Sequence, residues 1–185
     1  MEYVQERVTT LHDFGDADPD APTDRATVVV PMTERDHASL AAERVFATLE
    51  TVDRGRGLVA LRAAVEAVGD VTAWLDDFDL ATTVLWCDAP PLAEALADAG
   101  LDGQRGKGRD VWLALGVAAS QSDVVVVHDA DAKSYAPTHV PRLLFPLQNG
   151  FDFAKGYYAR VENNRLYGRL NRLFYVPVVR TLAEA

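Results

Sequence analysis

The apolar residues of this chain fall into two alternating patterns. Short continuous runs occupy residues 27–30, 57–61, 82–86 and 124–127, and the last of these runs is four valines. Unbroken apolar runs bounded by polar residues are typical of strands buried on both faces of a parallel sheet. We therefore predict four strands, the first of which is closed by Pro31.

Between and after these runs, apolar residues recur at helical spacing. The predicted helices cover residues 37–52, a segment that begins at Ala63 or Val71 and ends at Leu75, and residues 91–99, 109–119 and 140–147. Strands that alternate with helices of this length imply an α/β fold with a mostly parallel sheet, flanking helices and right-handed crossovers.

Three further segments set the limits of the domain. Residues 13–25 are acidic and rich in Asp and Pro, which predicts a loop within an N-terminal segment 1–26, followed by a single domain over 27–185. Residues 151–159 have the composition of a strand, and residues 166–183 that of a helix interrupted at Pro177.

In the helix over 109–119 we place four apolar residues on one face: Val111, Trp112, Leu115 and Ala118.

Two carboxylates follow the valine run, in the sequence HDAD at 128–131. Asp129 and Asp131 would lie at the carboxyl edge of the sheet, where open α/β sheets bind ligands. Two hard oxygen donors this close suit Mg²⁺ or Mn²⁺, which also bind phosphate oxygens. The alternative is that they are solvated loop acids. A phosphatase with an Asp nucleophile is disfavoured, because that motif follows the first strand and Lys133 stands where a small residue is needed.

Two other segments carry candidate chemistry. Gly106-Lys107-Gly108 opens a predicted helix, and glycines beside a compact positive charge suit a phosphate at a helix N-terminus. It is not the longer phosphate loop, because Arg109 stands where Ser or Thr is required. After the first strand, Glu34 is expected either to bind a ribose hydroxyl or base, or to belong to a cap of the next helix.

The composition narrows the function further. The net charge is −10, with 19 Asp against 9 Glu and 15 Arg against 3 Lys, which we interpret as adaptation to concentrated salt. No basic stripe favours nucleic acid, and neither a membrane span nor a secretory leader is recognisable. The single cysteine, Cys87, ends an apolar run and is expected to be a buried structural thiol. A cytoplasmic location is the default expectation.

The second half of the chain adds a basic, aromatic character in KGYYAR at 155–160 and YGRLNR at 167–172, which would suit a phosphorylated or carboxylated ligand. Together with PMTERD after the first strand, the GKG segment and HDAD, this series resembles the glucosyl-3-phosphoglycerate synthases, and their archaeal members in particular. These are retaining glycosyltransferases with the Rossmann-like GT-A fold. The resemblance covers residues 27–182.

The resemblance implies a role for each matching position. The donor, a nucleotide sugar such as UDP- or GDP-glucose, would be bound by six residues: Pro31, Met32, Thr33, Glu34, Lys107 and Asp129. Asp129 and Asp131 would hold Mg²⁺ or Mn²⁺. The acceptor, 3-phosphoglycerate or a similar small phosphorylated acid, would meet three residues: Gly168, Arg169 and Asn171. No protein nucleophile is assigned.

The chain also departs from that family. The family commonly has an Asp-containing turn after the second strand that reads the base, whereas residues 61–64 here are LRAA, so the base stays open. Asn171 replaces the common Thr, and the chain stops where the family continues. A catalytically incomplete GT-A domain that only binds nucleotide sugar is therefore the alternative. A nucleotidyltransferase is disfavoured, because PMTERD lacks glycines. Exposed apolar residues within 166–179 are compatible with a homodimer.

Overall fold

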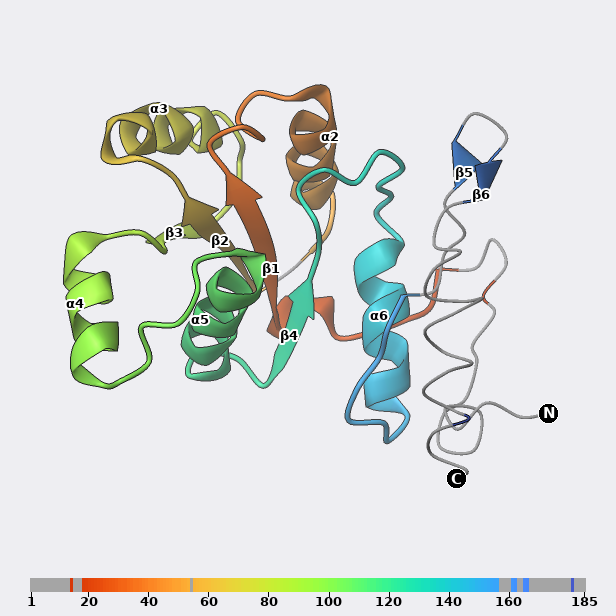
Figure 1. Cartoon of the computed structure of the whole chain (residues 1–185). Helices are drawn as coiled ribbons and strands as arrows, with labels where there is room; N and C mark the ends of the chain where they lie inside the picture. Colours follow the sequence, from red (N-terminus) through yellow and green to blue (C-terminus); the bar gives the residue numbers. More distant parts are fainter. Residues whose placement is uncertain are drawn as a thin grey trace.

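The computed structural model describes residues 14, 18–53, 55–156, 161–162, 165–166 and 181, in which strands alternate with helices (Figure 1). The strands are β1 (Ala26–Thr33), β2 (Arg56–Arg62), β3 (Thr82–Trp86), β4 (Val124–Val127), β5 (Val161–Glu162) and β6 (Arg165–Leu166). The helices are the 3-10 turn η1 (Thr23–Arg25), α2 (Leu40–Glu50), α3 (Val65–Leu75), α4 (Pro90–Asp98), α5 (Lys107–Ala119) and α6 (His139–Gln148).

The main sheet has four parallel strands in the order β3-β2-β1-β4. The chain therefore builds outward from β1 through β2 to β3 and then returns to place β4 on the other side of β1. This confirms the predicted α/β fold with a parallel sheet flanked by helices, and it is consistent with a Rossmann-like GT-A fold. All four strands predicted from the apolar runs are present.

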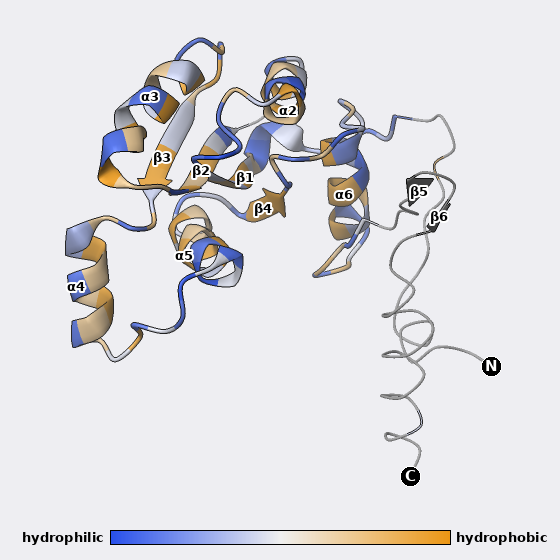
Figure 2. Cartoon of the chain, turned by 45° about the horizontal axis from the view of Figure 1, so that its top comes forward, coloured by the Kyte–Doolittle hydropathy of each residue, from blue (hydrophilic) through white to orange (hydrophobic). Residues whose placement is uncertain are grey.

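Helices cover both faces of the sheet (Figure 1). On one face, apolar residues of α2, α3 and α6 pack against β1, β2 and β4 around the buried side chain of Phe46. On the other face, α5 packs against β1 and β2 through Ala114 and Ala118. Figure 2 shows that β4 is hydrophobic along its length, whereas the helices carry both hydrophobic and hydrophilic residues. The valine run is a strand, as predicted, but it is not buried on both faces along its length: β4 is an edge strand of the main sheet, Val126 is buried and Val127 is 37% exposed.

The face of α5 that packs on the sheet differs from the predicted one. Asp110, Ala114 and Ala118 are buried, whereas Trp112 is 53% and Leu115 is 38% exposed. Small residues at every fourth position let the helix lie close to the strands, and the bulky apolar side chains are left outside. The predicted face is therefore right for Ala118 and wrong for Trp112 and Leu115.

β1 extends through Pro31 to Thr33, whereas we predicted that Pro31 would close it. The backbone N–H of His128, directly after β4, donates to the carbonyl of Val29 at 3.0 Å, so Val29 directs its peptide groups toward β4. Residues two apart in a strand face the same way. The nitrogen of Pro31 therefore points past the end of β4, whose pairing with β1 ends at Val127. Proline removes no ladder hydrogen bond at this position.

The helix limits also need two corrections. α2 begins at Leu40, three residues later than predicted, because Ser39 is its N-cap and the Ser39 hydroxyl accepts from the Ala42 N–H at 3.2 Å. Residues 33–36 therefore do not cap it. α5 begins at Lys107, two residues earlier than predicted, and the start of α3, left open between Ala63 and Val71, is Val65.

The C-terminal predictions are only partly covered by the described residues. Residues 151–156 form no strand, contrary to prediction, and residues 157–159 lie outside the description. Leu166 belongs to β6, which pairs antiparallel with β5, rather than to a helix. Most of 167–183 is outside the described residues. In the part of the chain that is described, no helix combines the length and the apolar composition that crossing a bilayer requires.

Candidate functional site

The strand order creates one place in the main sheet where the chain reverses direction across it. β1 is followed by β2 and β3 on one side and flanked by β4 on the other, so the carboxyl ends of β1 and β4 meet at this reversal. Crossover segments leave the sheet in opposite directions there, and the resulting crevice is where open α/β sheets bind ligands. Sequence motifs that follow β1 and β4 are therefore brought together by topology.

A pocket of about 100 Å³ lies at this edge. Its lining comes from the ends of β1 and β2, the start of α5 and the loop after β4: Pro31, Met32, Thr33, Asp36, Arg62, Lys107, Asp110, Ala130 and Asp131. Five of these nine residues are among the predicted donor and metal residues. Ligand pockets commonly measure about 300–1,000 Å³, so this one is small and would hold only part of a nucleotide sugar.

Lys107 connects the pocket to the acid pair. Its Nζ lies 2.6 Å from Oδ1 of Asp129, and the two side chains are 52% and 53% exposed. Lys107 is also the first residue of α5, whose N-terminus carries the positive end of the helix dipole. Asp129, which does not line the pocket itself, therefore lies beside it through its pairing with Lys107.

Asp129 and Asp131 fit a divalent cation that is shared with a phosphorylated ligand. Both are exposed and follow β4 directly, so their oxygens are accessible. Within the described residues, no group of three or more His, Cys, Asp or Glu side chains is arranged to hold a metal. Mg²⁺ is usually held by one or two carboxylates together with substrate phosphates, not by an all-protein cage. Two carboxylates at a ligand crevice match that donor set.

The segment after β1 is shaped by two carboxylates. Oδ2 of Asp36 accepts from the N–H of Thr33 at 2.7 Å and from its hydroxyl at 2.9 Å. Oε2 of Glu34 accepts from the N–H of Ala64 at 2.9 Å, which ties this turn to the loop after β2. Glu34 is therefore not part of a cap for α2, and it is not among the pocket-lining residues. Asp36, which was not predicted as a site residue, lines the pocket instead of Glu34.

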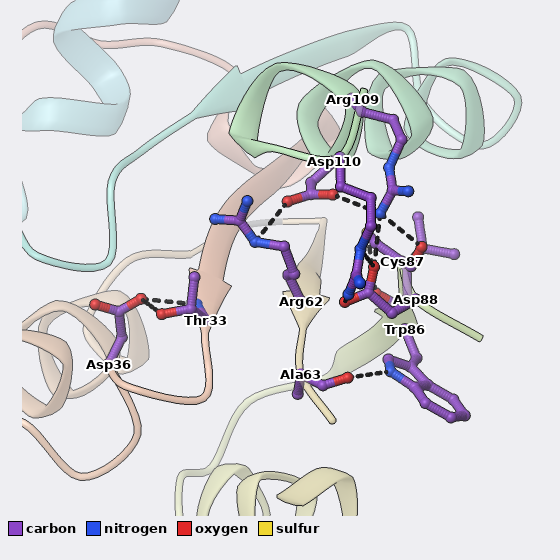
Figure 3. Close-up of polar contacts among 11 residues, drawn as sticks. Thr33, Asp36, Arg62, Ala63, Trp86, Cys87, Asp88, Arg109 and Asp110 are labelled. Atoms are coloured by element: carbon purple, nitrogen blue, oxygen red, sulfur yellow. Dashed lines mark hydrogen bonds and ion pairs between the residues drawn. The ribbon is translucent and has the colours of Figure 1, made fainter. Parts of the chain in front are cut away.

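Arg62 and Asp110 were also missed by sequence reasoning. Figure 3 shows Arg62 projecting from the end of β2 toward Asp110 on α5. Nε of Arg62 lies 3.5 Å from Oδ2 of Asp110, whose side chain is only 3% exposed. The signal available in the sequence was an acidic residue in the first turn of a helix that packs on the sheet, but its partner lies 48 residues earlier and only the fold brings them together.

A second arginine links Asp110 to the end of β3. Nη2 of Arg109 donates to Oδ1 of Asp88 at 2.7 Å, to the carbonyl of Cys87 at 3.1 Å and to Oδ1 of Asp110 at 3.4 Å (Figure 3). Arg105 adds two hydrogen bonds to Asp88, one of them from Nε at 3.0 Å. The charges along this edge are therefore held in fixed positions before any ligand arrives.

The two carboxylates that share Arg109 have opposite pKa shifts. Burial raises the pKa of Asp110, and the charges of Arg62 and Arg109 offset this only in part. Burial acts on Asp88 in the same sense, but hydrogen bonds and charges from Arg105 and Arg109 outweigh it and lower the pKa of Asp88. Asp88 is thus well compensated as an anion, whereas Asp110 is not.

Cys87 is 1% exposed, which confirms the predicted burial, and burial together with the charge of Asp110 raises its thiol pKa to about 12. His128 and His139 pack with Tyr135: the ring centroids of His128 and Tyr135 are 4.9 Å apart. Burial and the charge of His139 lower the pKa of His128 to about 4, so its imidazole is neutral near pH 7.

The predicted acceptor residues Gly168, Arg169 and Asn171 lie outside the described residues.

Comparison with known proteins gives the following similarities. No protein-family model matches the chain. A glucosyl-3-phosphoglycerate synthase of Methanococcoides burtonii is 31% identical over 203 residues, which covers 98% of this chain and 50% of that protein. A glucosyl-3-phosphoglycerate synthase of Persephonella marina is 38% identical over 130 residues, which covers 65% of this chain and 32% of that protein. The resemblance predicted from the motifs is confirmed, and the chain spans half or less of the length of these two relatives.

Proposed function

From this similarity we propose that the chain is the donor-binding part of a glycosyltransferase. The enzyme moves a hexosyl group, most simply glucosyl, from a nucleotide sugar to 3-phosphoglycerate or a similar small phosphorylated acid. It uses Mg²⁺ or Mn²⁺ as its metal cofactor. The observation that carries the proposal is the convergence of the motifs. Pro31, Met32, Thr33, Lys107 and Asp131 come from three segments far apart in sequence, and they line one pocket at the reversal of the strand order.

Each residue has a role that follows from its chemistry. Asp129 and Asp131 hold the divalent cation, which supplies positive charge to the diphosphate leaving group. Lys107 and the N-terminus of α5 add positive charge at the same edge. Pro31 and Met32, both buried at the end of β1, form an apolar wall of the pocket.

The remaining roles rest on the resemblance. Gly168, Arg169 and Asn171 bind the acceptor, with Arg169 gripping its phosphate or carboxylate in bidentate fashion. The reaction retains the configuration of the sugar without a protein nucleophile. The alternative is a GT-A domain that binds nucleotide sugar without turnover; the predicted site residues that line the described pocket are all donor or metal residues.

The test is calorimetric titration of UDP-glucose and GDP-glucose, with and without Mn²⁺, in molar KCl because of the acidic composition. Wild type is compared with Asp131→Ala and with Asp123→Ala. Asp123 is a matched control, since it directly precedes β4, is largely exposed and lies at the opposite end of the strand from Asp131. We expect binding that needs both Mn²⁺ and Asp131 but not Asp123.

Turnover separates the two readings. Incubation of the same protein with the bound nucleotide sugar and 3-phosphoglycerate should release nucleoside diphosphate and form a glucosylated product. Metal-dependent binding without transfer would favour the binding module. Failure of a folded wild-type protein to bind either nucleotide sugar, or binding that is indifferent to Asp131, would contradict the proposed donor site.

A further inference from the structure

Arg62 lines the pocket, and the resemblance assigns it no role. It is the last residue of β2, pairs with Thr33 of β1 and is 30% exposed on the pocket side. Its Nη1 faces the start of α5, because a Cβ placed on Gly106 would lie 3.9 Å from that atom. This residue stands in the segment where the resembled family commonly carries an acidic turn that reads the base.

The guanidinium of Arg62 is oriented by one ion pair. Its Nε faces Oδ2 of Asp110 at 3.5 Å, while Arg109 takes the other oxygen of that carboxylate. Asp110 lies on a helix packed against β1 and β2, so the anchor is rigid. Within the described residues, neither terminal nitrogen of Arg62 has a hydrogen-bond acceptor. The two terminal nitrogens therefore present a fork of donors to the pocket.

The fork lies where the base of a bound donor would be. Neighbouring strands are about 4.8 Å apart, so the ends of β2 and β4, on either side of β1, are separated by roughly 10 Å. A diphosphate bound beside Asp129 and Asp131 after β4 leaves its base one ribose away along the sheet edge. That position coincides with the end of β2, at the side of the pocket that Arg62 lines.

The chemistry of the bases distinguishes the candidates. Guanine presents two adjacent acceptors, O6 and N7, which match the two donors of an arginine fork. Uracil presents isolated carbonyl oxygens on either side of an N–H, so only one of them can meet the fork. The pocket also contains Asp36, whose Oδ2 is taken by Thr33 and whose other oxygen is available to accept from the ring N–H and amino group of guanine.

We propose that Arg62, oriented by Asp110, reads the base of the donor and selects a guanosine over a uridine nucleotide sugar. This inference rests on the proposed function, because it concerns the same donor pocket. Arg62 is then the specificity-determining residue of the site, and Asp110 is a positioning residue that acts through it.

The experiment measures the affinities of GDP and UDP by calorimetry with Mn²⁺ in molar KCl. The proteins are wild type, Arg62→Lys, Arg62→Met and Arg56→Met. Arg56 is the matched control, because it is the first residue of the same strand, at the opposite edge of the sheet. The Arg62→Lys variant keeps a cation beside Asp110 and removes only the fork of donors. It therefore tests the proposal even if Arg62→Met does not fold. Thermal melting checks the folding of each variant.

We expect wild type to bind GDP more tightly than UDP by roughly 5- to 150-fold, the range for a bidentate arginine–guanine contact. Both Arg62 variants should bring this ratio toward one by weakening GDP, while Arg56→Met keeps it. A wild-type ratio near one would overturn the proposal, as would a ratio unchanged in folded Arg62→Lys and Arg62→Met. Equal loss of GDP and UDP would also overturn it, by showing that Arg62 supplies charge to the phosphates. These three results leave the donor site standing, whereas binding of neither nucleotide by wild type contradicts the proposed function itself.

Discussion

Replacing Asp88 and Asp110 by asparagine, one at a time, should have different effects on stability. The two carboxylates are both nearly buried and both contact Arg109. However, the pKa of Asp88 is lowered and that of Asp110 is raised. The folded state therefore stabilises the charged form of Asp88, whereas it favours the neutral form of Asp110. Asparagine removes the charge from each with little change in shape.

The size of each effect follows from the contacts. Asp88 accepts a 2.7 Å bond from Arg109, which is 13% exposed, and a charge-assisted bond of this kind contributes about 1.5–3 kcal/mol. The bonds from Arg105, whose side chain is 66% exposed, add little because water screens them. We expect Asp88→Asn to cost about 2 kcal/mol, or about 4–8 °C in Tm for a chain of this size. Asp110→Asn should change stability by no more than about 0.5 kcal/mol or be slightly stabilising, since Arg62 can turn toward solvent.

The pH dependence of the two variants has opposite signs. Asp88 contributes stability in its charged form, so its contribution is complete above its ordinary pKa of about 3.9 and is lost as the pH falls through its lower folded value. The deficit of Asp88→Asn should therefore be constant between about pH 5 and 7 and shrink below about pH 4. Asp110 contributes in its protonated form, and this is lost as the pH rises through its raised folded pKa. Asp110→Asn should gain relative to wild type as the pH rises.

The assay is urea unfolding and thermal melting followed by circular dichroism in constant salt from pH 3 to 7. Asp123→Asn is the control, because Asp123 is an exposed acid whose ion pair with Arg25 is also exposed, and no measurable change is expected. Equal destabilisation by Asp88→Asn and Asp110→Asn, or a larger loss for Asp110→Asn, would refute the assignment of the stabilising charge to Asp88.

Two further predictions concern packing. A Cβ at Gly55 would meet the backbone carbonyl of Asp24, so Gly55→Ala should destabilise the fold by about 1–3 kcal/mol. A Cβ at Gly116 would have nothing within 4 Å, so Gly116→Ala should stabilise the fold by about 0.5–1 kcal/mol. Urea unfolding measures both effects, and similar effects at the two positions would contradict the packing. Cys87, buried and with a pKa of about 12, should react with a thiol reagent at pH 8 at least about a thousandfold more slowly in the folded than in the unfolded protein; fast labelling of the folded chain would show that the thiol is accessible.

Local patterns in the sequence were sufficient to predict the sheet and two of the motifs. The valine run before Asp129 is long enough to define a strand, and a parallel sheet then fixes the carboxyl edge as the place of the acid pair. Likewise, glycines around Lys107 indicate a close backbone approach. The strand, the parallel sheet and a helix that begins at Lys107 are confirmed, because each depends on a few adjacent residues and on a general rule of α/β topology, whereas the ligand roles of both motifs stay predictions.

The parts of the site that were missed depend on contacts between distant segments. Arg62 and Asp110 meet only because β2 packs under α5, and no spacing in the sequence records that contact. The same helix shows why its buried face was mispredicted. A bulky residue such as Trp112 dominates a hydrophobicity pattern, but the close packing of α5 on the sheet requires Ala114 and Ala118. Burial here follows size rather than hydrophobicity.

The ion pair of Lys107 with Asp129 leads to a final prediction: replacing the lysine should have opposite effects on the affinity for the metal and on the affinity for the nucleotide sugar. The lysine lies 2.6 Å from a proposed metal ligand, so it competes with a divalent cation for that carboxylate, yet it is also proposed to contact the donor phosphates. Because both side chains are half exposed, the pair contributes about 0.2–1 kcal/mol. Lys107→Met should therefore tighten the binding of Mn²⁺ alone by up to about fivefold while weakening nucleotide-sugar binding. Titrations of Mn²⁺ and of nucleotide sugar against Lys107→Met and against Arg56→Met, which removes a positive charge at the opposite edge of the sheet, measure both. A weaker affinity for Mn²⁺, or an unchanged affinity for the nucleotide sugar, would show that Lys107 does not exchange its ion pair with Asp129 for a contact with the donor phosphates.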